Sequence, residues 1–394
     1  MFNITWKYFG NHWLAIGLLG LVAWSQTKAE VNLPEQVPDA GSIMRNQPRP
    51  LIPSPSVQPP IAVPQPSPPA AGASGKITPK DWKITGATLI PESELKNSIQ
   101  EYLGRELSVQ DLWEATQKVA MYYSQKGYLV RAWLPEQEIR NGVVEIRVVE
   151  GKLDDVTVTD PAGAISAERA RGTILAAQSR GEYLRMDDLE RGVLLLNDMP
   201  GVSVTPTLKQ GSKAGTTSLD LNIKSRPLIN GSLDYANAGI NTVGEHQFGG
   251  SLFINNAFGV GDQATFRLQG GSGNVYGRLT YTMPVGNSGL RVGIAGSGMY
   301  YVLSDVPYFT GVGITDVGIS GVTGRKRLSD LDFDGDAWVG GAFASYPLVR
   351  GNKANVYSLA GFDTRRYHNV TNVETISDKT INVGYVGLQG DYRD

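Results

Sequence analysis

GYLVRAWLPEQEIRNGVVEIRVVEGKLDDVTV, residues 127–158, is the stretch that decides the predicted fold of this chain. Apolar and polar residues alternate over residues 128–134 and again over residues 143–149, and Asn141-Gly142 stands just before the second run. Alternation with a period of two predicts strands, and an Asn-Gly pair between two such runs favours a β-hairpin.

A second structural unit is predicted to begin where this hairpin ends, because Glu150-Gly151 is followed by a third alternating segment. Residues 76–151 and residues 152–226 share one order: a strand, two helices and two strands. The predicted elements are a strand at 82–88, helices at 91–102 and 108–126 and the hairpin, then a strand at 153–158, helices at 166–178 and 186–197, and strands at 202–208 and 218–223. This internal repeat of roughly seventy residues gives two compact domains.

The N-terminal region has the features of an exported chain. Lys7 precedes an apolar run at residues 13–24, and Thr27-Lys28-Ala29 follows it, which predicts a secretory signal peptide over residues 1–29. A membrane anchor helix is the alternative, although the run is short for a span. Residues 30–75 are rich in proline and poor in large apolar residues, so we expect a disordered linker there.

The composition excludes several classes of function. The formal net charge of −2 gives no electrostatic argument for nucleic-acid binding. The chain has no cysteine, which excludes disulfide frameworks and thiolate metal sites. Its three histidines, His12, His246 and His368, lack the spacing of a metal site or a catalytic triad. We therefore predict no catalytic residue, no metal site and no cofactor, and we interpret the chain as a protein that is not an enzyme.

From Arg226-Pro227 onward the sequence alternates in segments of about ten residues separated by turns rich in glycine, asparagine and aspartate. One apolar face and one polar face on successive strands predict a transmembrane β-barrel over residues 227–394, with lipid outside and water inside. A soluble β-sandwich would also alternate, but with fewer glycines. Short connections are expected at 257–262, 285–289 and 348–353, and a long one at 303–336.

Several short motifs carry a resemblance to a known family. They are Gly127-Tyr128, Leu134-Pro135-Glu136-Gln137, Asn141-Gly142, Val149-Glu150-Gly151, Asp198-Met199-Pro200-Gly201-Val202 and Phe258-Gly259-Val260-Gly261-Asp262. Their order resembles that of the two-partner secretion transporters, the haemolysin secretion/activation family, whose polypeptide-transport-associated (POTRA) domains precede a barrel. The resemblance implies an α+β fold of tandem POTRA domains (β-α-α-β-β) followed by an antiparallel transmembrane β-barrel of about sixteen strands.

We count about eight strands, and the chain ends in Tyr392-Arg393-Asp394 without the aromatic final residue of a finished barrel, so a C-terminal truncation is predicted. Many members of the family also carry a pore-plugging helix before the linker. The sequence between residues 30 and 48 shows no convincing amphipathic helix, and we expect none there.

The function that the resemblance implies is translocation through the bacterial outer membrane. The POTRA domains would lie in the periplasm and recognise the N-terminal secretion module of a large secreted exoprotein, adhesin-like or haemolysin-like, while the barrel contacts outer-membrane lipid. Two alternatives remain open: a barrel-assembly factor of the same superfamily, and a passive porin with periplasmic modules. Neither alternative involves nucleic acid.

Recognition is expected at an exposed sheet edge, where an extended client can add a strand by main-chain pairing. The predicted edge strand gives four client-binding residues: Tyr128, Val130, Ala132 and Leu134. The other motif residues are assigned to turns, caps and strand ends; these are Gly127, Pro135, Gln137, Gly142, Glu150, Gly151, Pro200 and Gly201. Among them, Glu150-Gly151 is interpreted as the hinge between the two modules.

Overall fold

The structure is a computed structural model that describes residues 20–26, 39–45, 76–160, 162–237, 239, 243–303, 307–309, 325–327, 333–371 and 375–393. The chain divides into two compact units, which are described separately. One unit, here the module unit, holds Ser56–Asp198 and Val202–Ser225. The other, here the sheet unit, holds Arg226–Asp394 together with N-terminal segments and Met199–Gly201.

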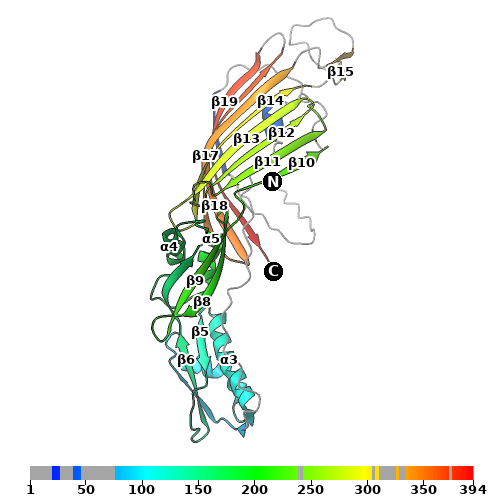
Figure 1. Ribbon diagram of the computed structural model, residues 1–394. Coiled ribbons are helices and arrows are strands. Elements are labelled where there is room, and N and C mark those ends of the chain that lie inside the picture. The colour runs from blue at the N-terminus through cyan, green and yellow to red at the C-terminus, as the bar shows by residue number, and fades with distance from the viewer. Residues whose placement is uncertain are drawn as a thin grey trace. The chain divides into compact units, whose positions relative to one another are not determined.

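The first module of the module unit has the predicted order of elements (Figure 1). They are β2 (Lys76–Ile77), β3 (Asp81–Thr85), α2 (Glu92–Ser98), the 3₁₀ helix η1 (Gln100–Tyr102), β4 (Leu107–Ser108), α3 (Val109–Gln125), β5 (Val130–Trp133) and β6 (Val143–Glu150). The sheet order is β3-β6-β5, in which β3 runs parallel and β5 antiparallel to β6.

Helix α3 covers one face of this sheet and begins at a capping box. The Ser108 hydroxyl accepts a hydrogen bond from the Asp111 N–H at 3.2 Å, and the Ser108 N–H donates to the Asp111 carboxylate at 2.7 Å. Val119 and Tyr123 on α3 are fully buried against Trp82 of β3, in a core that includes the buried face of β6. Burial of this apolar helix face against the sheet is the main source of stability for so small a module.

The second module repeats the topology of the first. Its elements are β7 (Lys152–Thr159), α4 (Ala167–Ala177), α5 (Met186–Asn197), β8 (Val202–Gln210) and β9 (Thr216–Ser225). The sheet order is β7-β9-β8, in which β7 runs parallel and β8 antiparallel to β9. Both modules thus place their first strand parallel to their last, with the middle strand at one edge.

The sheet unit is an antiparallel meander. Eight strands pair with their neighbours in chain order: β10 (Ile229–Ala236), β11 (Gln247–Asn255), β12 (Gln263–Gly271), β13 (Asn274–Val285), β14 (Leu290–Val302), β17 (Asp334–Arg350), β18 (Ala354–Val370) and β19 (Thr375–Tyr392). The short strands β15 (Pro307–Phe309) and β16 (Arg325–Arg327) pair separately. The meander is not closed into a barrel, because β10 has one strand neighbour among the described residues.

The two faces of the meander differ in polarity. Leu233 and Phe248 are exposed on one side, here the apolar face, together with Phe266. Asp234 and Arg267 lie on the opposite side, here the polar face, where their side chains form a bidentate ion pair at 2.9 Å. A sheet with an exposed apolar face of this extent fits the predicted lipid contact. Among the described residues, no helix is long and apolar enough to cross a membrane.

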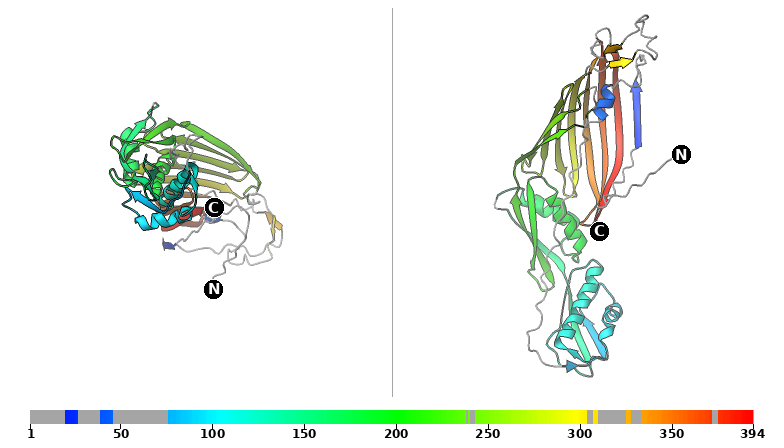
Figure 2. Two further views of the ribbon diagram at one scale, coloured as in Figure 1. Left: turned by 90° about the horizontal axis from the view of Figure 1, so that it is seen from below. Right: turned by 90° about the vertical axis from the view of Figure 1, so that its right-hand side faces the viewer.

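Two N-terminal segments belong to the sheet unit. Strand β1 (Gly20–Gln26) pairs antiparallel with β19, and it lies inside the predicted signal peptide. Helix α1 (Ala40–Arg45) corrects the expectation of a linker without a helix, and Figure 2 shows it beside the meander. Six residues are too few to show amphipathic periodicity, and α1 is held by packing on the sheet. Cleavage after Ala29 and the linker over residues 46–75 concern residues outside the described ranges, and both stay predictions.

Gly86 is the position at which the first module tolerates no side chain. Its φ is +85°, and a Cβ atom there would lie 2.1 Å from the Val148 carbonyl oxygen of β6. Gly104 has a similar φ of +72°, but nothing lies within 4 Å of its added Cβ. We expect Gly104→Ala to lower the free energy of unfolding of the module by about 1 kcal/mol, because alanine disfavours a left-handed backbone. We expect Gly86→Ala to lower it by at least about 2 kcal/mol more, because β3 and β6 must separate to make room for the methyl group.

The measurement is hydrogen exchange of the β6 amides in the full chain in detergent micelles. Equal protection in the two variants would show that the contact between Gly86 and Val148 does not limit the packing of the sheet.

Candidate functional site

Strand β5 lies at the edge of the first module's sheet. It pairs with β6 through Val130 opposite Glu150, Arg131 opposite Val149, Ala132 opposite Val148 and Trp133 opposite Arg147. The Gly151 N–H donates to the Leu129 carbonyl at 3.3 Å. The Leu129 carbonyl therefore points toward the end of β6, whereas its N–H is bonded elsewhere, to the Leu184 carbonyl. Because backbone groups alternate in direction along an antiparallel strand, Arg131 directs its N–H and C=O toward β6, while Val130 and Ala132 direct theirs to the open side.

The predicted client-binding residues do not present their side chains to this open edge. Ala132 is fully buried, and Tyr128, Val130 and Leu134 are partly buried against the module core. Leu134 lies beyond the last residue of β5. Tyr128 lies before the first residue, and its backbone bridges to Arg185 of the second module. A partner strand would therefore meet the backbones of Val130 and Ala132, whereas the four side chains serve the fold.

Gln137 completes β6 where β5 ends. The strand register would place Pro135, which has no N–H, opposite Glu145. Instead, the Gln137 amide nitrogen donates to the Glu145 carbonyl at 2.8 Å, and the Glu145 N–H donates to the Gln137 side-chain oxygen at 2.7 Å. Gly142 ends the connection with a φ of +77°, and its carbonyl accepts from the Lys80 N–H at 2.8 Å.

A buried amide in the second module does the same for β8, although no sequence motif identified it. Asn197 donates to the Val204 carbonyl at 3.1 Å and accepts from the Val204 N–H at 2.8 Å. Pro200 and Gly201 form the turn between these two residues, and Gly201 has a φ of +77°.

Glu150 and Gly151 lie at a junction that is hydrogen bonded on both sides, which does not fit their interpretation as a hinge. The Leu129 N–H donates to the Leu184 carbonyl at 3.0 Å, and the Leu184 N–H donates to the Gly151 carbonyl at 2.8 Å. With the bond from Gly151 to Leu129, the three residues form a closed ring of backbone hydrogen bonds. Gly127, with a φ of +84°, accepts a further bond from the Met186 N–H at 3.0 Å.

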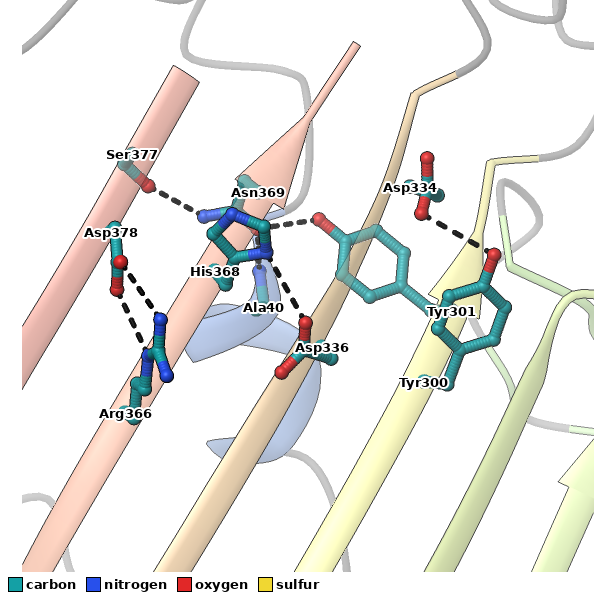
Figure 3. Close-up of polar contacts among 10 residues, drawn as sticks. All are labelled: Ala40, Tyr300, Tyr301, Asp334, Asp336, Arg366, His368, Asn369, Ser377 and Asp378. Carbon is teal, nitrogen blue, oxygen red and sulfur yellow. Dashed lines mark hydrogen bonds and ion pairs between the residues drawn. The ribbon is translucent and has the colours of Figure 1, made fainter. Parts of the chain in front are cut away.

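Helix α1 contacts the polar face of the meander through Asn369 of β18 (Figure 3). The Asn369 side-chain oxygen accepts from the Ala40 N–H at 3.0 Å and from the Tyr301 hydroxyl at 2.7 Å. The Asn369 amide nitrogen donates to the Ser377 hydroxyl at 2.7 Å. Ile43 is buried in the same place, in an apolar cluster that includes Tyr301. Nothing in the local sequence marks Asn369, because its partners are far away along the chain.

On the apolar face, the same end of the strands carries polar pairs (Figure 3). Arg366 forms a bidentate pair with Asp378, and Asp336 lies 3.3 Å from a ring nitrogen of His368. The Tyr300 hydroxyl donates to Asp334 at 3.3 Å. In the described part of the chain, no group of three or more histidine or acidic side chains is placed to hold a metal ion.

The role of Gln137 gives a prediction for the first module. Gln137→Ala leaves the Glu145 N–H and C=O without partners, which we expect to destabilise the module by about 1–3 kcal/mol. The neighbouring exposed substitution Glu138→Gln is the control and is expected to stay within about 0.5 kcal/mol of the parent chain. Hydrogen exchange of the β6 amides in the full chain measures both, and the assignment fails if Gln137→Ala exchanges like the control.

The matches to known proteins agree with this geometry. Residues 77–151 match the model of the POTRA domain, ShlB-type. The chain is 30% identical over 188 residues to the outer membrane transporter CdiB of Dickeya dadantii, which covers 48% of this chain and 33% of that protein. It is 23% identical over 303 residues to the heme/hemopexin transporter protein HuxB of Haemophilus influenzae, which covers 76% of this chain and 50% of that protein.

A solved structure shows the same fold. The structure of CdiB from Escherichia coli superposes with a TM-score of 0.55 at 20% sequence identity, over 84% of this chain and 59% of that one. The matches confirm the predicted resemblance and the predicted fold class. Residues 77–151 are similar to POTRA domains of the ShlB type, and the chain, which spans a third to a half of the length of these curated relatives, is similar to outer-membrane transporters of the CdiB and HuxB kind.

Proposed function

We propose that this chain acts in an outer-membrane pore that secretes a large partner exoprotein, with its POTRA modules in the periplasm and the meander in the membrane. The observation that carries the proposal is a ShlB-type POTRA domain in the same chain as an antiparallel sheet with an exposed apolar face. The similarity to transporters rather than enzymes supports the same proposal.

Recognition of the exoprotein takes place at the β5 edge. Each backbone hydrogen bond added there contributes about 0.5–1.5 kcal/mol, and the open part of the strand is four residues long, Val130–Trp133. Binding through so few main-chain bonds is weak and reversible, which suits a site that must hand the client on. It also accepts many client sequences, because the main chain is the same at every residue.

A proline at position 130 tests this site. Val130→Pro removes the N–H that faces the open side and leaves the bonds between Arg131 and β6 in place, as proline allows at a sheet edge. The binding partner tested is the N-terminal segment of any large exoprotein whose gene lies beside the gene for this chain. We expect Val130→Pro to weaken its binding about tenfold, which corresponds to about 1.4 kcal/mol.

Arg131→Ala is the control, because it changes an exposed side chain and keeps every backbone group; we expect it to bind like the parent chain. If Val130→Pro binds the segment normally while its module stays folded, the client does not pair with β5. If neither the parent chain nor any variant binds, the chain is a pore without a client.

Helix α1 closes part of the pore from the polar face of the meander. Ala40 and Ile43 are buried there, and the helix is tied to the sheet by the bond from the Ala40 N–H to Asn369. A six-residue helix attached through the N–H of its first residue to a side chain of the sheet is easily released, as an internal plug must be.

Asn369→Leu tests the attachment of α1. The substitution removes the bonds to Ala40, Tyr301 and Ser377 and keeps the branched arrangement of four side-chain heavy atoms, so we expect α1 to detach. A spin label on Ser42→Cys, in a chain without native cysteine, should become mobile in this variant. Thr364→Ala, which breaks the bond from β18 to Asn382, is the control and should leave the label immobile. An immobile label in Asn369→Leu would show that apolar packing alone holds the helix.

A further inference from the structure

Glu150 is a buried carboxylate at the end of β6, with 8% of its surface exposed. One carboxylate oxygen accepts hydrogen bonds from the Thr88 N–H at 2.7 Å, the Leu89 N–H at 2.7 Å and the Tyr123 hydroxyl at 2.8 Å. The other accepts from the Thr88 hydroxyl. None of these four donors carries a charge, so the carboxylate is stabilised by hydrogen bonds alone.

This environment keeps Glu150 ionised and Tyr123 protonated. Burial is the largest influence and raises the pKa of Glu150, but the donors of Leu89, Thr88 and Tyr123 together lower it below its usual 4.5. Burial, followed by the hydrogen bond to Glu150, raises the pKa of Tyr123. At neutral pH the pair therefore consists of a carboxylate and a phenol donor.

The Thr88 hydroxyl extends this network into the second module. It lies 3.1 Å from the hydroxyl of Tyr183, which belongs to the segment before α5. A hydroxyl has one proton, and that of Thr88 is donated to Glu150, so the Tyr183 hydroxyl must be the donor to Thr88. The negative charge of Glu150 thus orients a chain of two hydroxyls that starts in the other module.

The aromatic ring of Tyr183 also contacts a residue of its own module. The Lys152 ammonium lies 4.4 Å from the ring centroid, within the range of a cation–π contact. The backbone of Tyr183 bridges to Lys152 of β7, and the backbone of Arg185 bridges to Tyr128. Residues 183–185 therefore bridge to both modules, and Glu150 stands next to the backbone ring that Leu184 makes with Leu129 and Gly151.

We propose that Glu150 is a positioning residue that locks the two POTRA modules into one rigid body through Thr88 and Tyr183. The lock holds residues 183–186 along the outer side of Tyr128 and Leu129, so that the edge left open is Val130–Trp133. The lock itself is independent of any client, whereas its effect on the open edge rests on the proposed function.

The test measures the distance between the modules in the full chain in detergent micelles. Spin labels are placed on Gln110→Cys in α3 and Glu168→Cys in α4, two exposed positions in a chain without native cysteine. Pulsed electron–electron double resonance should give one narrow distance distribution for the parent chain. Tyr183→Phe removes only the donor hydroxyl. Glu150→Gln keeps an acceptor for the N–H donors but puts an amide NH2 against the Thr88 hydroxyl, which then has lost the acceptor for its proton; both variants should lose the narrow peak.

Glu145→Gln is the matched control, because Glu145 is on the same strand and accepts a hydrogen bond from the Thr85 hydroxyl at 2.8 Å, away from the junction. It should keep the narrow peak. A broad distribution in the parent chain, or a narrow peak in Tyr183→Phe, overturns the lock, whether or not Glu150→Gln folds. The distance measurement needs no client, so the two proposals can fail separately. If the parent chain gives a narrow peak and Val130→Pro loses client binding, both proposals are supported. If the parent chain gives a narrow peak and Val130→Pro binds the client normally, only the proposed client site is wrong.

Discussion

Backbone groups at the edges of small sheets need hydrogen-bond partners, and this requirement shapes the module unit more than any side-chain motif does. In the ring of Leu129, Leu184 and Gly151, the backbone N–H and C=O groups of three chain segments are hydrogen bonded to one another. Where the strands end, amide side chains take the place of a missing strand: Gln137 pairs with the backbone of Glu145, and Asn197 pairs with that of Val204. Between the backbone ring at Leu129 and the Gln137 side chain, the edge of β5 stays open among the described residues. An open edge is what the client that we propose would need.

In the sheet unit, neighbouring strands supply the hydrogen-bond partners of most backbone groups. Its two faces differ in the side chains that they carry. Apolar side chains such as Leu233 and Phe248 cover the face assigned to lipid, while charged pairs such as Asp234 with Arg267 lie on the other. The outer edge of β19 is taken by β1, which shows how readily a free strand edge accepts another segment of chain. On the polar face, Ala40 and Ile43 of α1 are buried in a cluster with apolar side chains of the sheet unit such as Tyr301.

Much of the fold follows from local signals in the sequence. Ser108 and Asp111 mark the start of α3, and period-two alternation marks β6 and the strands of the meander. Interactions between distant residues left no such signal. The Ala40 N–H and Asn369 are 329 positions apart, so α1 was expected to be linker. The hydrogen-bond donors to Glu150 come from the loop before α2 and from α3, far away along the chain, so the residue resembled part of a hinge. The β5 edge was predicted, but side-chain direction was not, because both faces of a short strand carry apolar residues.

The buried side chains of the β5 edge have an evolutionary consequence. Ala132 and Val130 are constrained by the core of their own module, while their backbones face outward. If a client pairs with β5 as we propose, its substitutions would exert little selective pressure on these positions, and the two proteins would diverge without correlated changes at their contact. Comparison of the two genes would then show no co-variation at the residues of β5. The preference of this protein for its own client would depend on shape, strand length or other surfaces of the two proteins.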